Sequence, residues 1–118
     1  MGEDVRHALT RAGIPFTDES NLASAVDGVD VVYQTRIQKE RFASDEEYAR
    51  NKGIYIVNAE TMAQLPTSAI VMHPLPRVDE IDTTFDRDPR AKYFDEAHNG
   101  VYVRMALLEA LLNGPWAS

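Results

Sequence analysis

Residues 70–81 read Ile-Val-Met-His-Pro-Leu-Pro-Arg-Val-Asp-Glu-Ile, an apolar run that is stopped by two prolines flanking one leucine. Neither Pro74 nor Pro76 has a backbone N–H, so a strand ending here cannot continue its ladder, and the residues before them are held extended. The carbonyls of residues 73–75 then lack sheet partners and suit a ligand with N–H groups, such as an amide or a carbamoyl group. The same pattern is typical of a proline-stiffened surface turn that binds nothing, and the stretch alone leaves both readings open.

Outside this stretch, helix and strand patterns alternate. The strand candidates are β-branched or apolar runs between glycine, asparagine and serine signals, and this order favours an α/β fold with a parallel, Rossmann-like sheet. The predicted helices are 3–12, 22–27, 45–52 and 59–64, and the predicted strands are 14–17, 29–33, 54–57 and 69–72. Gly13 and Gly28 end the first two helices, while Ser20 or Asn21 caps the second and Asn58 caps the fourth. The β-branched run at residues 29–33 has the length expected for a buried strand.

A second loop of interest, residues 34–42, follows the strand at 29–33. Arg36 and Gln38 project from one face of an extended segment, and together they offer a planar fork and an amide to an anionic small molecule. Glu40 is expected to orient Arg36. The carboxyl ends of parallel strands lie at the same edge of the sheet, so this loop and the loop after residue 72 are predicted to face one pocket. The alternative is a solvated charged loop.

Two further side chains near the prolines have open roles. His73 is a candidate general base, but a histidine at a strand end more often bonds nearby backbone, so a supporting role is favoured. Arg77 either binds a second anionic group or pairs with Asp79 or Glu80. Since the chain has no paired-ligand spacing and no glycine-rich phosphate loop, no metal and no cofactor are predicted.

Composition restricts the possible partners. The chain has 118 residues, 44% of them hydrophobic and 26% charged, which is ordinary for one globular unit. Its net charge of −7 disfavours nucleic-acid or anionic-membrane partners. The absence of cysteine excludes disulfides and thiolate metal sites and fits a reducing compartment. No leader or membrane-spanning run is evident, which indicates a soluble chain.

The C-terminal region is predicted to hold two helices. Asp88-Pro89-Arg90 is typical of a helix start and Asn99-Gly100 of its end. The last helix, within residues 100–113, is apolar nearly all round, with only Arg104 and Glu109 charged over residues 101–112. Such a helix needs partners on more than one side, which indicates a further domain or subunit.

Two of these motifs carry a resemblance to a known family. Residues 35–41, Thr-Arg-Ile-Gln-Lys-Glu-Arg, and residues 72–81, Met-His-Pro-Leu-Pro-Arg-Val-Asp-Glu-Ile, closely resemble the aspartate carbamoyltransferases, and the resemblance continues through residues 88–94 and 99–108. It covers essentially the whole chain. It implies an activity that transfers the carbamoyl group of carbamoyl phosphate to L-aspartate in pyrimidine biosynthesis.

The resemblance also implies roles for individual residues. Arg36 and Gln38 would bind aspartate, and Pro74, Leu75 and Pro76 would bind carbamoyl phosphate, with a cis bond before Pro76. The remaining candidates, Glu40, His73 and Arg77, would support the site. Ornithine-specific relatives carry cysteine where Pro74 stands, so aspartate is the favoured acceptor.

The family enzyme has two domains and acts as a trimer, and its Ser-x-Arg-Thr phosphate-binding motif is absent here. Residues 1–118 therefore resemble the C-terminal portion of the aspartate/ornithine-binding domain, an incomplete one, with residues 100–113 as the helix that packs on the carbamoyl phosphate domain. The catalytic set is incomplete, so this chain alone is predicted to be inactive. A cytoplasmic location is expected unless a transit peptide lies upstream. Two alternatives stay open: a non-catalytic small-anion-binding module, and a carbamoyltransferase with another amino-acid acceptor.

Overall fold

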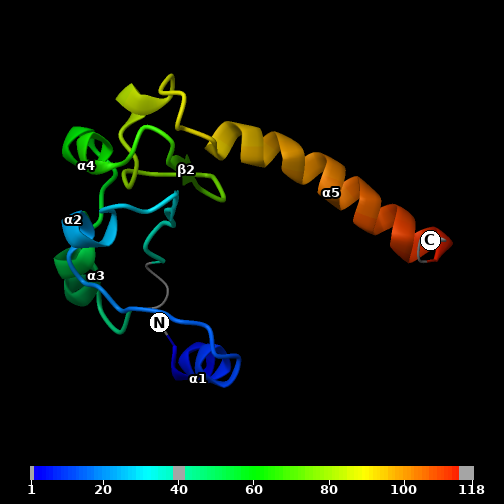
Figure 1. Ribbon diagram of the computed structural model, residues 1–118, viewed down its shortest axis with the longest axis horizontal. Coiled ribbons are helices and arrows are strands. Elements are labelled where there is room, and N and C mark those ends of the chain that lie inside the picture. Colours follow the sequence, from blue (N-terminus) through cyan, green and yellow to red (C-terminus); the bar gives the residue numbers. More distant parts are fainter. Residues whose placement is uncertain (1, 39–41, 115–118) are drawn as a thin grey trace.

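The computed structural model describes residues 2–38 and 42–114, and its elements are arranged as in Figure 1. Two helices precede each of the two strands, and one long helix follows the second strand. In order, the elements are α1 (Glu3–Arg11), α2 (Leu22–Ala25), β1 (Val31–Tyr33), α3 (Asp45–Asn51), α4 (Ala59–Gln64), β2 (Ile70–Met72), the 3₁₀ helix η2 (Thr83–Phe85) and α5 (Tyr93–Asn113).

The two strands form a parallel pair, as the alternation of helices and strands predicted. Val32 lies opposite Val71, and the ladder continues beyond the strand ends, where Gln34 N donates to Met72 O at 3.0 Å. Because the strands are parallel, the residues that follow Tyr33 and Met72 leave the sheet at the same edge. The prediction that the two loops share an edge is therefore confirmed.

Two predicted strands are wrong. Residues 14–17 form no strand, and from residues 54–57 only Val57 joins a bridge, with Ile81. A strand needs a neighbour for its N–H and C=O groups, and Pro15 also lacks a donor. The strand predicted at residues 29–33 forms at Val31–Tyr33, but the prediction that it is buried is wrong, because Val31 and Tyr33 are 50% and 53% exposed. No other described segment pairs with the far edge of β1.

The helix starts follow the predicted caps. Asn21 accepts a hydrogen bond from Ser24 N at 3.2 Å, and Asn58 accepts one from Thr61 N at 3.0 Å. Each bond satisfies a backbone donor of a first helical turn. Gly13 follows α1 with a φ of 65°, a left-handed conformation that glycine adopts without a steric penalty. Local capping chemistry thus sets these boundaries.

The core lies between the strand pair, α4 and the start of α5. It is small, and its fully buried members are mostly aliphatic: Val26, Val57, Met62, Leu65, Ala69, Val71, Ile81 and Tyr93. Tyr93 is 0% exposed, so the first residue of α5 anchors that helix in the core.

The prediction of two C-terminal helices is wrong. Residues 88–90 form a turn, and one helix of 21 residues, α5, continues through Gly100. Val71 N donates to Arg90 O and Lys92 N donates to Val71 O, both at 2.8 Å. These two bonds form a parallel bridge between Ala91 and Val71 of β2, so the helix begins only at Tyr93.

Beyond its first turns α5 extends away from the rest of the molecule (Figure 1). The radius of gyration is 17.5 Å, against about 13.5 Å for a compact domain of this length. The apolar side chains of this helix are widely exposed: Val101, Tyr102, Val103, Met105, Leu107, Leu108, Leu111 and Leu112. Within the described ranges, no helix is long and apolar enough to cross a membrane.

Candidate functional site

A cleft lies between the two loops at the shared edge of the sheet. Its volume is about 430 Å³, and it is lined by Thr35, Arg36, Ile37, Gln38, Phe42, His73, Pro74, Leu75 and Pro76. Six of the sequence-predicted site residues are therefore brought together, two from the loop after β1 and four from the loop after β2. Glu40 lies outside the described residues. Residues of the proline loop and an Arg–Gln pair thus line a single cavity of the size of a small polar ligand.

The loop after β2 has an unusual backbone. The bond between Leu75 and Pro76 is cis, and Leu75 has a φ of 34°, so the prediction that Leu75 is extended is wrong. Leu75 N donates a hydrogen bond to His73 Nδ1 at 2.9 Å. The loop conformation is therefore held by the side chain of its own first residue.

His73 is 1% exposed and uses both ring nitrogens within the loop. Since Nδ1 accepts the bond from Leu75 N, the proton of the neutral ring lies on Nε2, which donates to Glu80 Oε1 at 2.7 Å. The His73 backbone N–H donates to Glu96 Oε2 at 3.0 Å. This arrangement favours the supporting role over that of a general base, because neither ring nitrogen faces the cleft with an open position.

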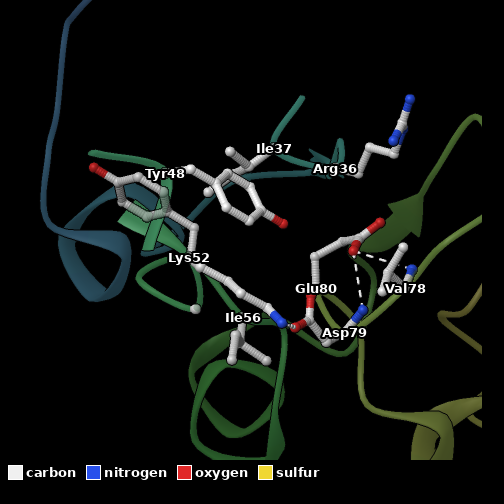
Figure 2. A pocket seen from close by; sticks show the side chains of 10 residues that line it. Arg36, Ile37, Tyr48, Lys52, Ile56, Val78, Asp79 and Glu80 are labelled. Atoms are coloured by element: carbon white, nitrogen blue, oxygen red, sulfur yellow. Dashed lines mark hydrogen bonds and ion pairs between the residues drawn. The ribbon is translucent and has the colours of Figure 1, made fainter. Parts of the chain in front are cut away.

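Glu80 closes the loop from the other end. Its Oε2 accepts bonds from Val78 N and Asp79 N, each at 3.1 Å (Figure 2). Burial alone would raise the pKa of this carboxyl, but the backbone donors of residues 78–80 and the His73 ring outweigh it and hold the pKa below its usual range. Glu80 is thus a structural carboxylate.

A smaller cavity of about 70 Å³ lies beside the cleft and shares Arg36 and Ile37 with it. Figure 2 shows Lys52, which follows α3, reaching across to Asp79, with 3.2 Å between Nζ and Oδ2. Both side chains are about half exposed, so the pair contributes little to stability. It does connect the segment after α3 to the loop that carries Glu80.

Arg77 pairs with neither Asp79 nor Glu80. Its Nη2 donates to Asp86 Oδ2 at 2.7 Å, its Nη1 bonds Asp86 Oδ1, and Tyr93 OH donates to Asp86 Oδ1 at 2.7 Å. The Arg77 guanidinium, aided by the Tyr93 hydroxyl, lowers the pKa of Asp86 to about 2. Burial and then the bond to Asp86 raise the pKa of Tyr93 to about 12. Arg77 therefore fixes the loop to the start of α5 and does not line the cleft.

Two residues at the edge of the site, Glu96 and Tyr33, were not predicted from the sequence. Glu96 lies on α5 and accepts bonds from His73 N and from Tyr33 OH, the latter at 2.5 Å. His73 and Tyr33 lie 23 and 63 residues from Glu96 in the sequence, so no local pattern could indicate these two contacts. Among the described residues, no group of three or more histidine, aspartate or glutamate side chains is placed to hold a metal ion.

These features define an α/β domain that forms a small-ligand cleft where two parallel strands end. Residues 3–111 match the family model for the Asp/Orn binding domain of aspartate/ornithine carbamoyltransferases. The chain belongs to this family, which confirms the resemblance and the predicted fold class.

Relatives named aspartate carbamoyltransferase match most of the chain. It is 48% identical over 115 residues to "Aspartate carbamoyltransferase 1, chloroplastic" of Pisum sativum, covering 97% of this chain and 30% of that protein. It is 47% identical over 116 residues to the aspartate carbamoyltransferase catalytic subunit of Methanobrevibacter smithii, covering 98% of this chain and 36% of that subunit. The chain thus spans about a third of the length of these relatives.

Solved structures of aspartate transcarbamoylases also match the chain. The catalytic subunit of M. jannaschii aspartate transcarbamoylase matches with a TM-score of 0.82 at 42% identity, covering 96% of this chain and 37% of that one. The Trypanosoma cruzi enzyme in complex with N-(phosphonacetyl)-L-aspartic acid matches with a TM-score of 0.79 at 36% identity, covering 99% and 37%.

Proposed function

We propose that this chain provides the acceptor-binding part of an aspartate carbamoyltransferase. The assembled enzyme transfers the carbamoyl group of carbamoyl phosphate to L-aspartate and releases N-carbamoyl-L-aspartate and phosphate, a step of pyrimidine biosynthesis. The observation that carries the proposal is the cleft in which Arg36 and Gln38 share one cavity with residues 73–76. The names of its relatives support it, as do the complexes of the T. cruzi enzyme with aspartate, carbamoyl phosphate and N-(phosphonacetyl)-L-aspartic acid.

Each loop has a role that fits its chemistry. The Arg36 guanidinium matches a carboxylate with two parallel N–H donors, and the Gln38 amide adds a donor and an acceptor. Across the cleft, the carbonyls around Pro74 and Leu75 accept the N–H bonds of a carbamoyl group. The neutral aspartate amine then attacks the carbamoyl carbon, the new C–N bond forms, the C–O bond to phosphate breaks, and the proton that the amine loses is accepted by the departing phosphate. The contribution of this chain is positioning of the two reactants.

The chain is proposed to work with a carbamoyl phosphate-binding domain. Residues 1–118 correspond to the C-terminal portion of the aspartate/ornithine-binding domain, and the exposed apolar part of α5, which includes residues 100–113, packs on the partner domain. This assignment accounts for the exposed leucines of α5 in a chain whose own core is small. The assembled enzyme is proposed to be a trimer in the cytoplasm or, as the names of the plant relatives suggest, in a plastid.

Complementation tests the proposal directly. The 118-residue chain is mixed with a separately produced carbamoyl phosphate-binding domain of a homologous enzyme, and carbamoyl-aspartate is measured with either component alone as the control. We expect turnover only in the mixture and loss of turnover with Arg36→Ala. Binding without turnover would favour a non-catalytic small-anion-binding module, and turnover with ornithine instead of aspartate would indicate a different acceptor. Activity of the chain alone, with host enzyme excluded, would contradict the predicted need for a partner.

A further inference from the structure

Glu96 on the first turn of α5 joins the carboxyl ends of both strands. Its Oε1 accepts a hydrogen bond from the hydroxyl of Tyr33, the last residue of β1, at 2.5 Å. Its Oε2 accepts one from the backbone N–H of His73, the residue directly after β2, at 3.0 Å. One carboxylate on a helix therefore bridges the two points at which the ligand loops leave the sheet.

From these two points the bonds continue into the loops. Beyond His73, the imidazole ring holds Leu75 N and Glu80, which fixes the loop that carries the carbonyls. Beyond Tyr33, the neighbouring Gln34 donates through its backbone N–H to Met72 O and through its side chain to Tyr55 O at 3.1 Å, at the start of the loop that carries Arg36. The bond to Glu96 also raises the pKa of Tyr33 above its usual value.

We propose that Glu96 is a positioning residue that keeps the carbonyl loop, residues 73–76, at a fixed separation from the arginine loop, residues 34–38. This inference rests on the proposed function, because it takes the separation of the two loops to set the separation of the two bound substrates. It also gives α5 a second role: the helix that exposes the apolar surface also sets the geometry of the cleft.

The bonding pattern predicts how substitutions behave. In Glu96→Ala the His73 N–H loses its acceptor in a place that water barely reaches, since His73 is 1% exposed. In Glu96→Gln the amide oxygen can accept from His73 N while the amide nitrogen donates to the Tyr33 hydroxyl oxygen. The conservative variant should therefore keep the loop position close to that of the wild type. Tyr33→Phe removes only the partially exposed bond and should have the smaller effect.

Amide hydrogen exchange in the 118-residue chain is the first test. We expect Glu96→Ala to accelerate exchange at His73 and Leu75 about tenfold or more, and Glu96→Gln less than threefold. Asp95→Ala is the matched control, because Asp95 is the adjacent carboxylate and is 67% exposed. The Val57 amide, buried in the core and bonded to Glu80 O, reports global opening. Equal acceleration at His73, Leu75 and Val57, or no acceleration, would overturn the proposal.

Kinetics in the complemented enzyme is the second test. A positioning role predicts that Glu96→Ala raises the KM for carbamoyl phosphate about tenfold with a smaller fall in kcat, and that Glu96→Gln restores it, while Asp95→Ala changes neither. Wild-type KM and kcat in Glu96→Ala would overturn the inference. If the wild-type mixture shows no turnover, the proposed function fails, and the exchange experiment still decides whether Glu96 fixes the carbonyl loop.

Discussion

His73 and Glu80 form a buried pair whose energetics follow from their partners. Removing the ring in His73→Ala leaves the Glu80 carboxylate, in a residue that is 6% exposed, without its side-chain donor, and leaves Leu75 N without its acceptor. We expect the free energy of unfolding to fall by about 3 kcal/mol. Urea unfolding followed by circular dichroism measures this loss.

The double variant distinguishes pairing from simple truncation. If the two side chains act together, His73→Ala with Glu80→Ala costs less than the sum of the single changes, with a coupling of at least about 1 kcal/mol. Strict additivity would contradict the pairing.

Asp86 makes stability depend on pH in a defined window. Its folded pKa of about 2 lies below the ordinary value of 3.8, so its contribution is present above pH 4 and is lost as the pH falls from about 4 to about 2. Because the side chain is 30% exposed, solvent reduces the contribution to about 1–2 kcal/mol.

In Asp86→Asn, the unfolding free energy should be lower at pH 6 and should change less between pH 6 and pH 3 than in the wild type. Urea midpoints across this range measure the difference. Parallel pH profiles for the two proteins would show that Arg77 and Tyr93 do not lower the pKa of Asp86.

At the scale of elements, the end of α4 depends on a residue far along the chain. Arg90 Nη1 donates to Met62 O at 2.8 Å and to Leu65 O at 3.2 Å, and so satisfies carbonyls at the C-terminus of that helix. Asp88 holds the guanidinium with two oxygens. We expect Arg90→Ala to cost about 2 kcal/mol, whereas Arg87→Ala, at an exposed neighbouring arginine, should change the unfolding free energy by less than about 0.5 kcal/mol. Equal losses in urea unfolding would show that the cap is not the cause.

Substitution by alanine should change stability in opposite directions at Gly100, inside α5, and at Gly13, just after α1. Gly100 lies inside α5 with a helical backbone, where a Cβ would meet only the flexible end of Arg104 at 3.4 Å, so Gly100→Ala should stabilise by about 0.5–1 kcal/mol. Gly13 has open space around it but a φ of 65°, so Gly13→Ala should destabilise by about 1 kcal/mol. Thermal unfolding of both variants measures the contrast; a shift of the same sign in both would contradict it.

The elements also show what sequence patterns predict and what they miss. Asn21, Asn58 and Gly13 act within a few residues of themselves, so the boundaries they set were predictable. The strand at residues 14–17 failed because a strand depends on a distant neighbour, and the helix start at Pro89 failed because residues 90–92 bond to β2. In the site, the two loops were predictable from proline and charge patterns. The Asp86 partner of Arg77 and the bridge through Glu96 depend on tertiary contacts.

At the scale of the whole molecule, α5 holds more exposed apolar surface than a stable monomer normally shows. Leu111 and Leu112 are each 81% exposed at its far end, and the leucines and valines before them are about half exposed. Surfaces of this kind associate with whatever apolar partner is available. In the absence of a partner domain, the available partner is a second copy of the same chain.

We therefore expect the isolated chain to self-associate and the partner domain to suppress this association. Replacing Leu111 and Leu112 with glutamine removes apolar area at the helix tip without touching the core, so the double variant should remain monomeric at concentrations where the wild type does not, and should complement turnover poorly. Val78→Gln is the control, because Val78 is 72% exposed but lies in the loop before Ile81. Light scattering coupled to size exclusion measures both proteins. Unchanged association of the leucine variant, together with normal complementation, would mean that this end of α5 is not the docking surface.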